Sequence, residues 1–280
     1  MIGFCTDSGS QMPADLRHRF DVEIVALTVT INGVHYLEGV DLDADAFYET
    51  LARCAEPPEV LTAAPSPGRF AAAYERLAAR GFDQIVSVHT GSNLSSTVNS
   101  ARLGATGAPA PVAIADTQTG SFAVSCALRE AAEAAGRGAT VEEVVAIAEA
   151  VGKSCGNVFV VGGLELARAG GRLAAGTSSE PDATPVLSLI EDKIETIGSA
   201  ASVAEGAEIM AAHVVAAGPG LRVGIGIADA AAEPYWLEFE RRLSVAPEVD
   251  DILRYRVGPS VGAHTGTGCA GAVYYRPISA

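Results

Sequence analysis

The alternation of two kinds of segment is the strongest constraint on how this chain can fold. Short apolar runs rich in β-branched residues, such as Gln84–His89 and Val112–Asp116, predict buried strands. Longer alanine-rich runs between them have the spacing of amphipathic helices. Because strands that alternate with helices form βαβ units, the sequence predicts an α/β fold with largely parallel sheets.

Several helices are marked by their end signals. Ser66 before Pro67 predicts an N-cap and first-turn proline for a helix that runs to Arg80. The run Thr140-Val141-Glu142-Glu143 predicts a capping box at the start of helix Val141–Lys153. A short helix is predicted over Tyr235–Leu243. The predicted strands are Ile2–Thr6, Glu23–Ile31, Gln84–His89, Val112–Asp116, Val158–Gly162, Val186–Glu191, Arg222–Ala228, Asp251–Val257 and Ala270–Tyr275.

The chain has 280 residues, which is room for one large domain or two of ordinary size. The polar stretch Lys153–Asn157 contains a glycine, ends a long predicted helix and precedes a new buried strand. We therefore predict two α/β domains, an N-terminal one over residues 1–156 and a C-terminal one over residues 157–280.

Charge and composition exclude several classes of protein. The formal net charge of −15 repels nucleic acid and anionic lipid surfaces. No apolar stretch approaches the ~20 residues of a membrane helix, and the acid at Asp7 with no basic segment before it argues against a signal peptide. The five scattered cysteines are typical of buried thiols in a reducing compartment. We expect a cytoplasmic protein without stable membrane insertion and without a nucleic acid partner.

Signatures of catalysis are weak. Gly258-Pro259-Ser260-Val261-Gly262 matches the G-x-S-x-G elbow of α/β-hydrolases, and His264 is close by. That fold needs an acid between the serine and the histidine, and no Asp or Glu follows Asp251. We predict a non-helical, glycine-rich turn after Ser260, and a serine hydrolase stays the weaker alternative. The histidines lack metal-ligand spacing and no phosphate loop is present, so we expect no metal, no cofactor and no catalytic residues.

Hydroxyl-rich turns follow or precede several predicted elements. Thr6–Ser10 follows the first strand, Thr62–Pro67 precedes a helix, and His89–Thr97 leads from a strand into a helix. In parallel α/β sheets, ligands bind beyond the carboxyl ends of the strands. Hydroxyls and backbone N–H groups at a helix start favour an anion such as a carboxylate. The turns therefore indicate binding of an anionic ligand.

The same turns carry a resemblance to the DegV family. Thr6-Asp7-Ser8 resembles that family's opening, and further motifs follow in order over nearly the whole chain. They are Asp41–Tyr48, Thr62 with Pro65-Ser66-Pro67 and Phe70, Gly91–Ala101 (similar to S-S-x-L-S-G-T-Y-x-S-A), Asp116-Thr117, Gly170-Gly171-Arg172-Leu173, and Gly258–Gly268 with His264-Thr265-Gly266-Thr267-Gly268.

The resemblance implies two α/β domains, the N-terminal one with a parallel sheet and the C-terminal one with a mixed sheet. It implies one long-chain fatty acid in a buried tunnel, with its carboxylate near the domain junction. Carried onto this sequence, the carboxylate contacts are Thr62 and a serine of the turn, Ser92 or Ser95, with the Asn93 amide as a further donor and with Arg172 and His264 close to the head group.

The resemblance also implies presentation of the fatty acid to a separate fatty acid kinase, as in some bacterial members. The basic segment that the family carries after the strand near Ile197 is missing, because no Lys or Arg lies between Lys193 and Arg222. That gap argues against the kinase partner. The main alternative to fatty-acid binding is a ligand-free interaction or regulatory protein on the same scaffold.

Overall fold

A computed structural model of the chain describes residues 1–54, 58–162, 183–190 and 193–278. The chain forms two compact units that are not contiguous in sequence. The first unit holds Met1–Asp41, Glu59–Cys155 and Pro277–Ala280, and the second holds Leu42–Pro58 and Gly156–Arg276. Residues 42–58, which precede the boundary drawn from the sequence, thus group with the second unit.

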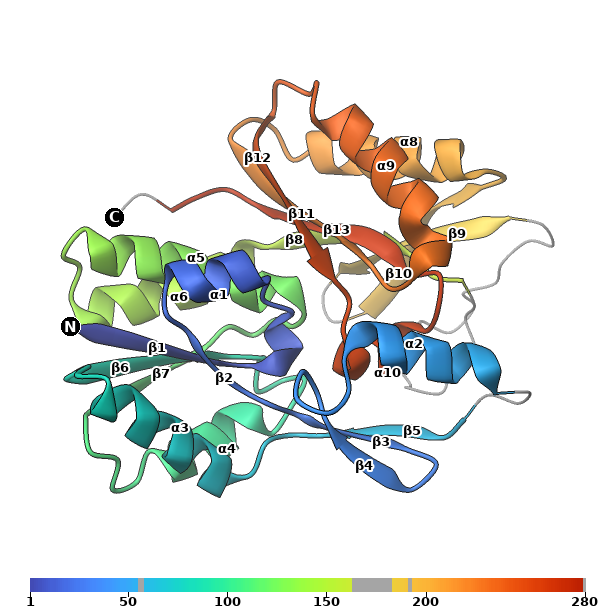
Figure 1. Ribbon diagram of the computed structural model, residues 1–280. Coiled ribbons are helices and arrows are strands. Elements are labelled where there is room, and N and C mark those ends of the chain that lie inside the picture. Colours follow the sequence, from blue (N-terminus) through green and yellow to red (C-terminus); the bar gives the residue numbers. More distant parts are fainter. Residues whose placement is uncertain (55–57, 163–182, 191–192, 279–280) are drawn as a thin grey trace. The chain divides into compact units, whose positions relative to one another are not determined.

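The first unit is built on a four-stranded parallel sheet. Its order is β2 (Glu23–Val25), β1 (Ile2–Asp7), β6 (Gln84–His89) and β7 (Val112–Asp116). Figure 1 shows α3 (Pro67–Ala79) and α4 (Thr97–Gly104) on one face and α5 (Phe122–Gly136) and α6 (Val141–Ser154) on the other. Both faces of β1 and β6 are therefore buried, which explains why these strands read as continuous apolar runs. The 3₁₀ helix η1 (Ser8–Ser10) and α1 (Ala14–Arg19) follow β1.

A second, antiparallel sheet of the first unit has the order β4 (Val34–Leu37), β3 (Thr28–Ile31) and β5 (Val60–Ala63). The prediction of one strand over Glu23–Ile31 was wrong, because the chain leaves the parallel sheet after β2 and enters this sheet at β3. The change of sheet occurs at Leu27, whose N–H donates to Ser8 Oγ (2.9 Å) and whose carbonyl accepts from the Glu38 N–H (3.0 Å). Leu27 therefore belongs neither to β2 in the parallel sheet nor to β3 in the antiparallel sheet.

The second unit contains a six-stranded mixed sheet. The order is β10 (Lys193–Ala200), β9 (Thr184–Ile190), β8 (Gly156–Val160), β13 (Ala270–Tyr275), β11 (Leu221–Ile227) and β12 (Val249–Arg256). Only β11 and β12 are parallel neighbours in this sheet as described. Helices α8 (Val203–Val215) and α9 (Glu233–Leu243), the latter after the 3₁₀ helix η2 (Ala230–Ala232), pack on the sheet around Met210 and Phe239. The predicted fold class, two α/β domains with a parallel and a mixed sheet, is confirmed.

Two helices of the second unit come from distant parts of the chain. Helix α2 (Ala44–Arg53) contacts α10 (Pro259–Thr265), and Asp45 Oδ1 accepts from Arg256 Nη2 at 2.6 Å. The prediction of a non-helical turn after Ser260 was wrong, because Gly258 is the N-cap of α10 and Pro259 its first residue. Gly262 allows the close packing, since a Cβ there would lie 2.5 Å from Tyr48 Oη.

The helix ends predicted from local signals agree with the structure. The Thr140 hydroxyl accepts from the Glu143 N–H at 3.3 Å, and the Glu143 carboxylate accepts from the Thr140 N–H at 2.8 Å. The capping box is therefore confirmed, and α6 begins at Val141 as expected. Ser66 is the N-cap of α3 and Pro67 its first residue, also as expected.

Candidate functional site

Three polar segments meet at one edge of the parallel sheet. Because β1, β6 and β7 run in the same direction, Asp7, His89 and Asp116 all lie at their carboxyl ends. The loop 90–96 continues from His89 into α4, and the loop 117–121 continues from Asp116 into α5. This is the edge at which parallel α/β sheets bind their ligands.

A chain of buried polar side chains begins at this edge and runs into the core. Asp7 and His89 are fully buried, and His89 Nδ1 lies 2.9 Å from Asp7 Oδ2. His89 Nε2 lies 2.6 Å from Ser87 Oγ, which lies 3.0 Å from Tyr74 Oη. Phe70 packs edge-on against the His89 ring, with the centroids 5.0 Å apart. Burial raises the pKa of the Tyr74 phenol far above its ordinary value, so Tyr74 stays a neutral donor.

The direction of one bond in this chain is fixed. A carboxylate only accepts, so His89 Nδ1 carries a proton and donates it to Asp7. The order Ser87–His89–Asp7 matches the connectivity of a hydrolase triad. Ser87, however, is fully buried and its hydroxyl lies between Tyr74 and His89. A substrate carbonyl has no path to it in this structure, so the arrangement acts as a structural support.

The loop after β6 is held to the loop after β7 by several hydrogen bonds. Asp116 Oδ1 accepts from the Ser92 N–H (3.0 Å), and the Gln118 side chain donates to Ser92 Oγ (3.1 Å). The Asn93 amide donates to the Gln118 carbonyl at 3.3 Å. Desolvation acts to raise the pKa of Asp116, but the bonds from Ser92 and Gln118 outweigh it and lower the pKa. A glycine is required at position 91, where a Cβ would lie 2.6 Å from the Gln118 Cα.

Ser95 stands at the entrance to α4. Its hydroxyl accepts from the Thr97 N–H (3.3 Å) and lies 2.8 Å from the Thr97 hydroxyl. When Thr97 donates, the Ser95 proton is left to point at a ligand. The first turn of α4 carries no acidic residue, so the partial positive charge of the helix start is not neutralised there. Ser95 and α4 together suit an anionic group.

The predicted site residues lie on four different parts of the chain. Ser92, Asn93 and Ser95 share one loop, with the first two exposed and Ser95 half-buried. Thr62 is half-buried on β5, opposite Val29 of β3. His264 is half-buried on α10 in the second unit. Arg172 lies outside the described residues. The role of these six residues as carboxylate contacts stays a prediction.

Sequence reasoning missed the residues that hold the loop in place. In the sequence, Asp7 belongs to a hydroxyl-rich turn and to the Thr6-Asp7-Ser8 motif, His89 belongs to a second such turn, and Gln118 belongs to no motif. An acid and a histidine at the carboxyl ends of two predicted strands are a signal for such a pair. The signal becomes specific only when the two strands are known to be neighbours, and these residues are 82 positions apart.

Ser260 does not have the placement of a nucleophile in the structure. It lies inside α10 and is only 6% exposed. Three cysteines are equally enclosed, and burial raises the pKa of Cys5 and of Cys269 to about 12. A thiol with such a pKa stays protonated at neutral pH and is a poor nucleophile.

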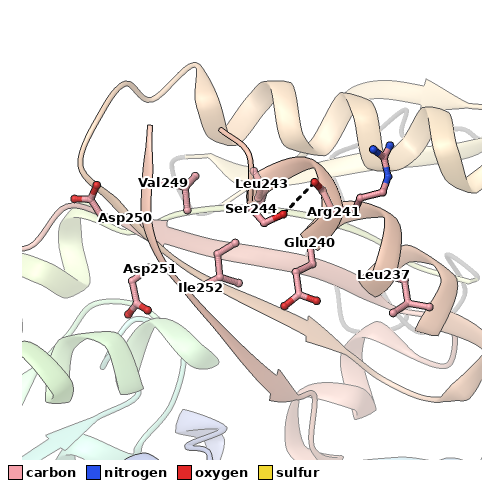
Figure 2. A pocket seen from close by; sticks show the side chains of 9 residues that line it. All are labelled: Leu237, Glu240, Arg241, Leu243, Ser244, Val249, Asp250, Asp251 and Ile252. Atoms are coloured by element: carbon pink, nitrogen blue, oxygen red, sulfur yellow. Dashed lines mark hydrogen bonds between the residues drawn. The ribbon is translucent and has the colours of Figure 1, made fainter. Parts of the chain in front are cut away.

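A surface pocket of about 540 Å³ lies in the second unit between α9 and β12, and none of its lining residues belongs to the predicted site. Figure 2 shows the carboxylates of Glu240, Asp250 and Asp251 among these side chains. Glu240 is paired with Arg254, which stacks on Trp236 at 4.5 Å. An excess of carboxylates repels a fatty acid head group. The residues lining the pocket are Leu237, Glu240, Arg241, Leu243, Ser244, Val249, Asp250, Asp251 and Ile252.

The described ranges, residues 1–54, 58–162, 183–190 and 193–278, contain neither a metal-binding cluster nor a membrane-spanning helix. The residues described there include no group of three or more His, Cys, Asp or Glu side chains placed to hold a metal ion. Among the helices of these ranges, none combines the length and the apolar character needed to cross a bilayer.

Comparison with known proteins gives consistent matches over the whole chain. The family model for uncharacterised proteins of the DegV family matches residues 1–277. A DegV domain-containing protein of Streptomyces coelicolor is 31% identical over 279 residues, which cover 97% of each chain.

Solved structures of similar fold also match over nearly the whole chain. A fatty-acid-binding DegV family protein from Thermus thermophilus superposes with a TM-score of 0.82 at 31% identity, covering 98% of this chain and 99% of that one. A stearic-acid-binding protein from Eubacterium ventriosum has a TM-score of 0.85 at 20% identity, covering 99% of both chains, and supports the fold alone.

Proposed function

Since the chain belongs to the DegV family, we propose that it binds one long-chain fatty acid, with the carboxylate held by hydroxyl groups. The observation that carries the proposal is the Ser92–Ser95 loop, which opens α4 at the ligand-binding edge of the parallel sheet. The Thermus thermophilus relative, described as fatty-acid-binding, is similar over nearly its whole length. A carboxylate at this loop would accept hydrogen bonds from the hydroxyl groups. It would also lie at the positive end of the α4 helix dipole.

We also propose a tunnel for the acyl chain and further contacts to the head group. We place the acyl chain in the interior of the first unit and add Thr62, Asn93, Arg172 and His264 to the head-group contacts, as the family resemblance implies. Hydroxyl and amide donors suit this task because they stabilise a carboxylate without adding a buried charge of their own. We propose that the protein binds its ligand and does not transform it.

Transfer of the bound acid to a separate kinase is a further step that the surface disfavours. The stretch between Lys193 and Arg222 contains no Lys or Arg, and its helix α8 carries Glu205 and Glu208. A kinase that docks on basic side chains would meet acidic ones here. The net charge of −15 adds to that repulsion when the kinase surface is acidic.

We expect the purified protein to carry a fatty acid of about 14–18 carbons, the range that the family resemblance implies. The tail supplies most of the affinity, since each buried CH₂ contributes ~0.8 kcal/mol to binding. Denatured protein is extracted and the extract analysed by mass spectrometry for stoichiometric fatty acid. Delipidated protein should also melt at a higher temperature when palmitate or oleate is added. An empty extract together with an unchanged melting temperature would contradict fatty-acid binding and favour the ligand-free interaction protein.

Thr62→Ala and Ser95→Ala are each expected to weaken palmitate binding by about 1–3 kcal/mol, the cost of losing a hydrogen bond to a buried charged group. Calorimetric titration of delipidated protein measures the change. Ser100→Ala is a matched control, because Ser100 lies one turn further along α4 from the loop that holds Ser95. Wild-type affinity in either variant would remove that residue from the head-group site.

A further inference from the structure

Asp7 is the most highly bonded carboxylate near the proposed site. It is fully buried and accepts from His89 Nδ1 at 2.9 Å, from the Thr90 N–H at 3.1 Å and from the Thr90 hydroxyl at 3.0 Å. A buried carboxylate requires such donors, and charge-assisted bonds are the strong ones. Two of the three come from Thr90, the first residue of the loop after β6.

The bonds to Asp7 fix Thr90 through its backbone and its side chain at once. The only hydroxyl proton of Thr90 is donated to Asp7, so Thr90 has none to offer a ligand. Its neighbour Gly91 donates its N–H to the Thr119 carbonyl at 2.7 Å. The loop is thereby anchored just before Ser92.

A second aspartate holds the other side of the same loop. Asp116 at the end of β7 accepts from the Ser92 N–H, as described above. The strand β6 lies between β1 and β7, so the loop that continues it is held by one aspartate from each neighbouring strand. Ser92 and Ser95 are positioned by this support.

We propose that Asp7 is a positioning residue for the head-group site, acting through Thr90 to hold the Ser92–Ser95 loop in its binding position. This inference rests on the proposed function, because a head group must bind at the loop for its position to matter. In this role Asp7, which is fully buried, acts through Thr90 and not by contact with the ligand. Its loss therefore affects recognition of the carboxylate and leaves the acyl chain's interactions in place.

Asp7→Asn preserves the shape of the side chain but turns one acceptor into a donor, which cannot accept from Thr90. We expect palmitate to bind about tenfold more weakly, the size of one lost charge-assisted bond. Hexadecanol, which has the same tail and no carboxylate, should bind within about twofold of its wild-type affinity. Thr90→Val removes the hydroxyl from the other side and should give the same selective loss. Both are measured by calorimetric titration.

Asp15→Asn is the control, because it removes one carboxylate from an exposed position on α1 of the same unit. Equal losses for palmitate and hexadecanol in Asp7→Asn and Thr90→Val, or no loss in either variant, would overturn the role of Asp7 and leave the proposed function standing. Failure of the wild-type protein to prefer palmitate over hexadecanol would instead contradict the head-group site itself, and the inference with it.

Discussion

Replacing His89 by leucine is expected to lower the free energy of unfolding of the first unit by about 3–5 kcal/mol, the cost of removing one partner of a buried charge. His89 is fully buried between Asp7 and Ser87, and its ring bonds to both. Leucine fills most of the space but neither donates to the Asp7 carboxylate nor bonds to the Ser87 hydroxyl. Two polar groups of the core are then left without this partner.

The two units can be followed separately in this experiment. The single tryptophan, Trp236, lies on α9 of the second unit, so its fluorescence follows that unit during urea unfolding. Hydrogen exchange of peptides from β1 and β6, measured by mass spectrometry, follows the first unit. The loss should appear in the β1 and β6 peptides.

His18→Leu is the matched control, because His18 is exposed on α1 and its replacement should change the stability by less than about 0.5 kcal/mol. The double variant Asp7→Leu with His89→Leu should be less destabilised than the sum of the single variants, since it leaves no unpaired carboxylate. A stability for His89→Leu equal to that of His18→Leu would show that the polar chain contributes nothing.

Gly152→Ala should destabilise the first unit, whereas Gly136→Ala should stabilise it. A Cβ on Gly152 of α6 would lie 2.5 Å from the Thr117 carbonyl oxygen, and overpacking of this kind costs about 1–3 kcal/mol. The better helix propensity of alanine offsets at most ~1 kcal/mol. At Gly136 of α5, a Cβ would meet nothing within 4 Å apart from its chain neighbours and the backbone of its own helix, so alanine is expected to stabilise the unit by about 0.4–1 kcal/mol.

The same two variants also test whether Thr117 couples helix α6 to the Ser92–Ser95 loop. The Thr117 hydroxyl donates to the His89 carbonyl at 2.8 Å, so a shift of Thr117 in Gly152→Ala reaches the start of the loop. We expect palmitate affinity to fall in Gly152→Ala and to stay unchanged in Gly136→Ala. Hydrogen exchange gives the stabilities and calorimetry the affinities. Stabilisation by both alanines would show that α6 moves away from Thr117 without cost.

Elements whose ends depend on local chemistry were predicted well. Gln84–His89 and Val112–Asp116 have the predicted ends, because each is a short apolar run closed by a polar turn. The start of α6 also followed from its capping box. Here the residues that decide the structure are neighbours in the sequence.

The predictions that were wrong concern residues whose contact partners are distant in the sequence. The apolar pattern continues through Ala26 and Leu27, and only the bond from Leu27 to Ser8 shows that the strand breaks there. Glycines around Ser260 suggested a turn, yet Gly262 serves the packing of α10 on α2. The support of the ligand loop by Asp7 was likewise hidden, because no local pattern reveals that β1 and β6 are neighbours.

Helix α2 is synthesised long before the part of the second unit that it packs against. Asp45 of α2 pairs with Arg256, 211 residues later, and Phe47 of the same helix is fully buried. At the ~5–20 residues per second of translation, α2 emerges from the ribosome about 10–40 s before the segment it packs against. The apolar side chains on one face of this amphipathic segment, Phe47 and Tyr48, therefore have no packing partner in the second unit for most of the synthesis of the chain. A ten-residue segment is only marginally helical by itself, so α2 becomes a stable helix only when residues 249–265 are available to pack against it.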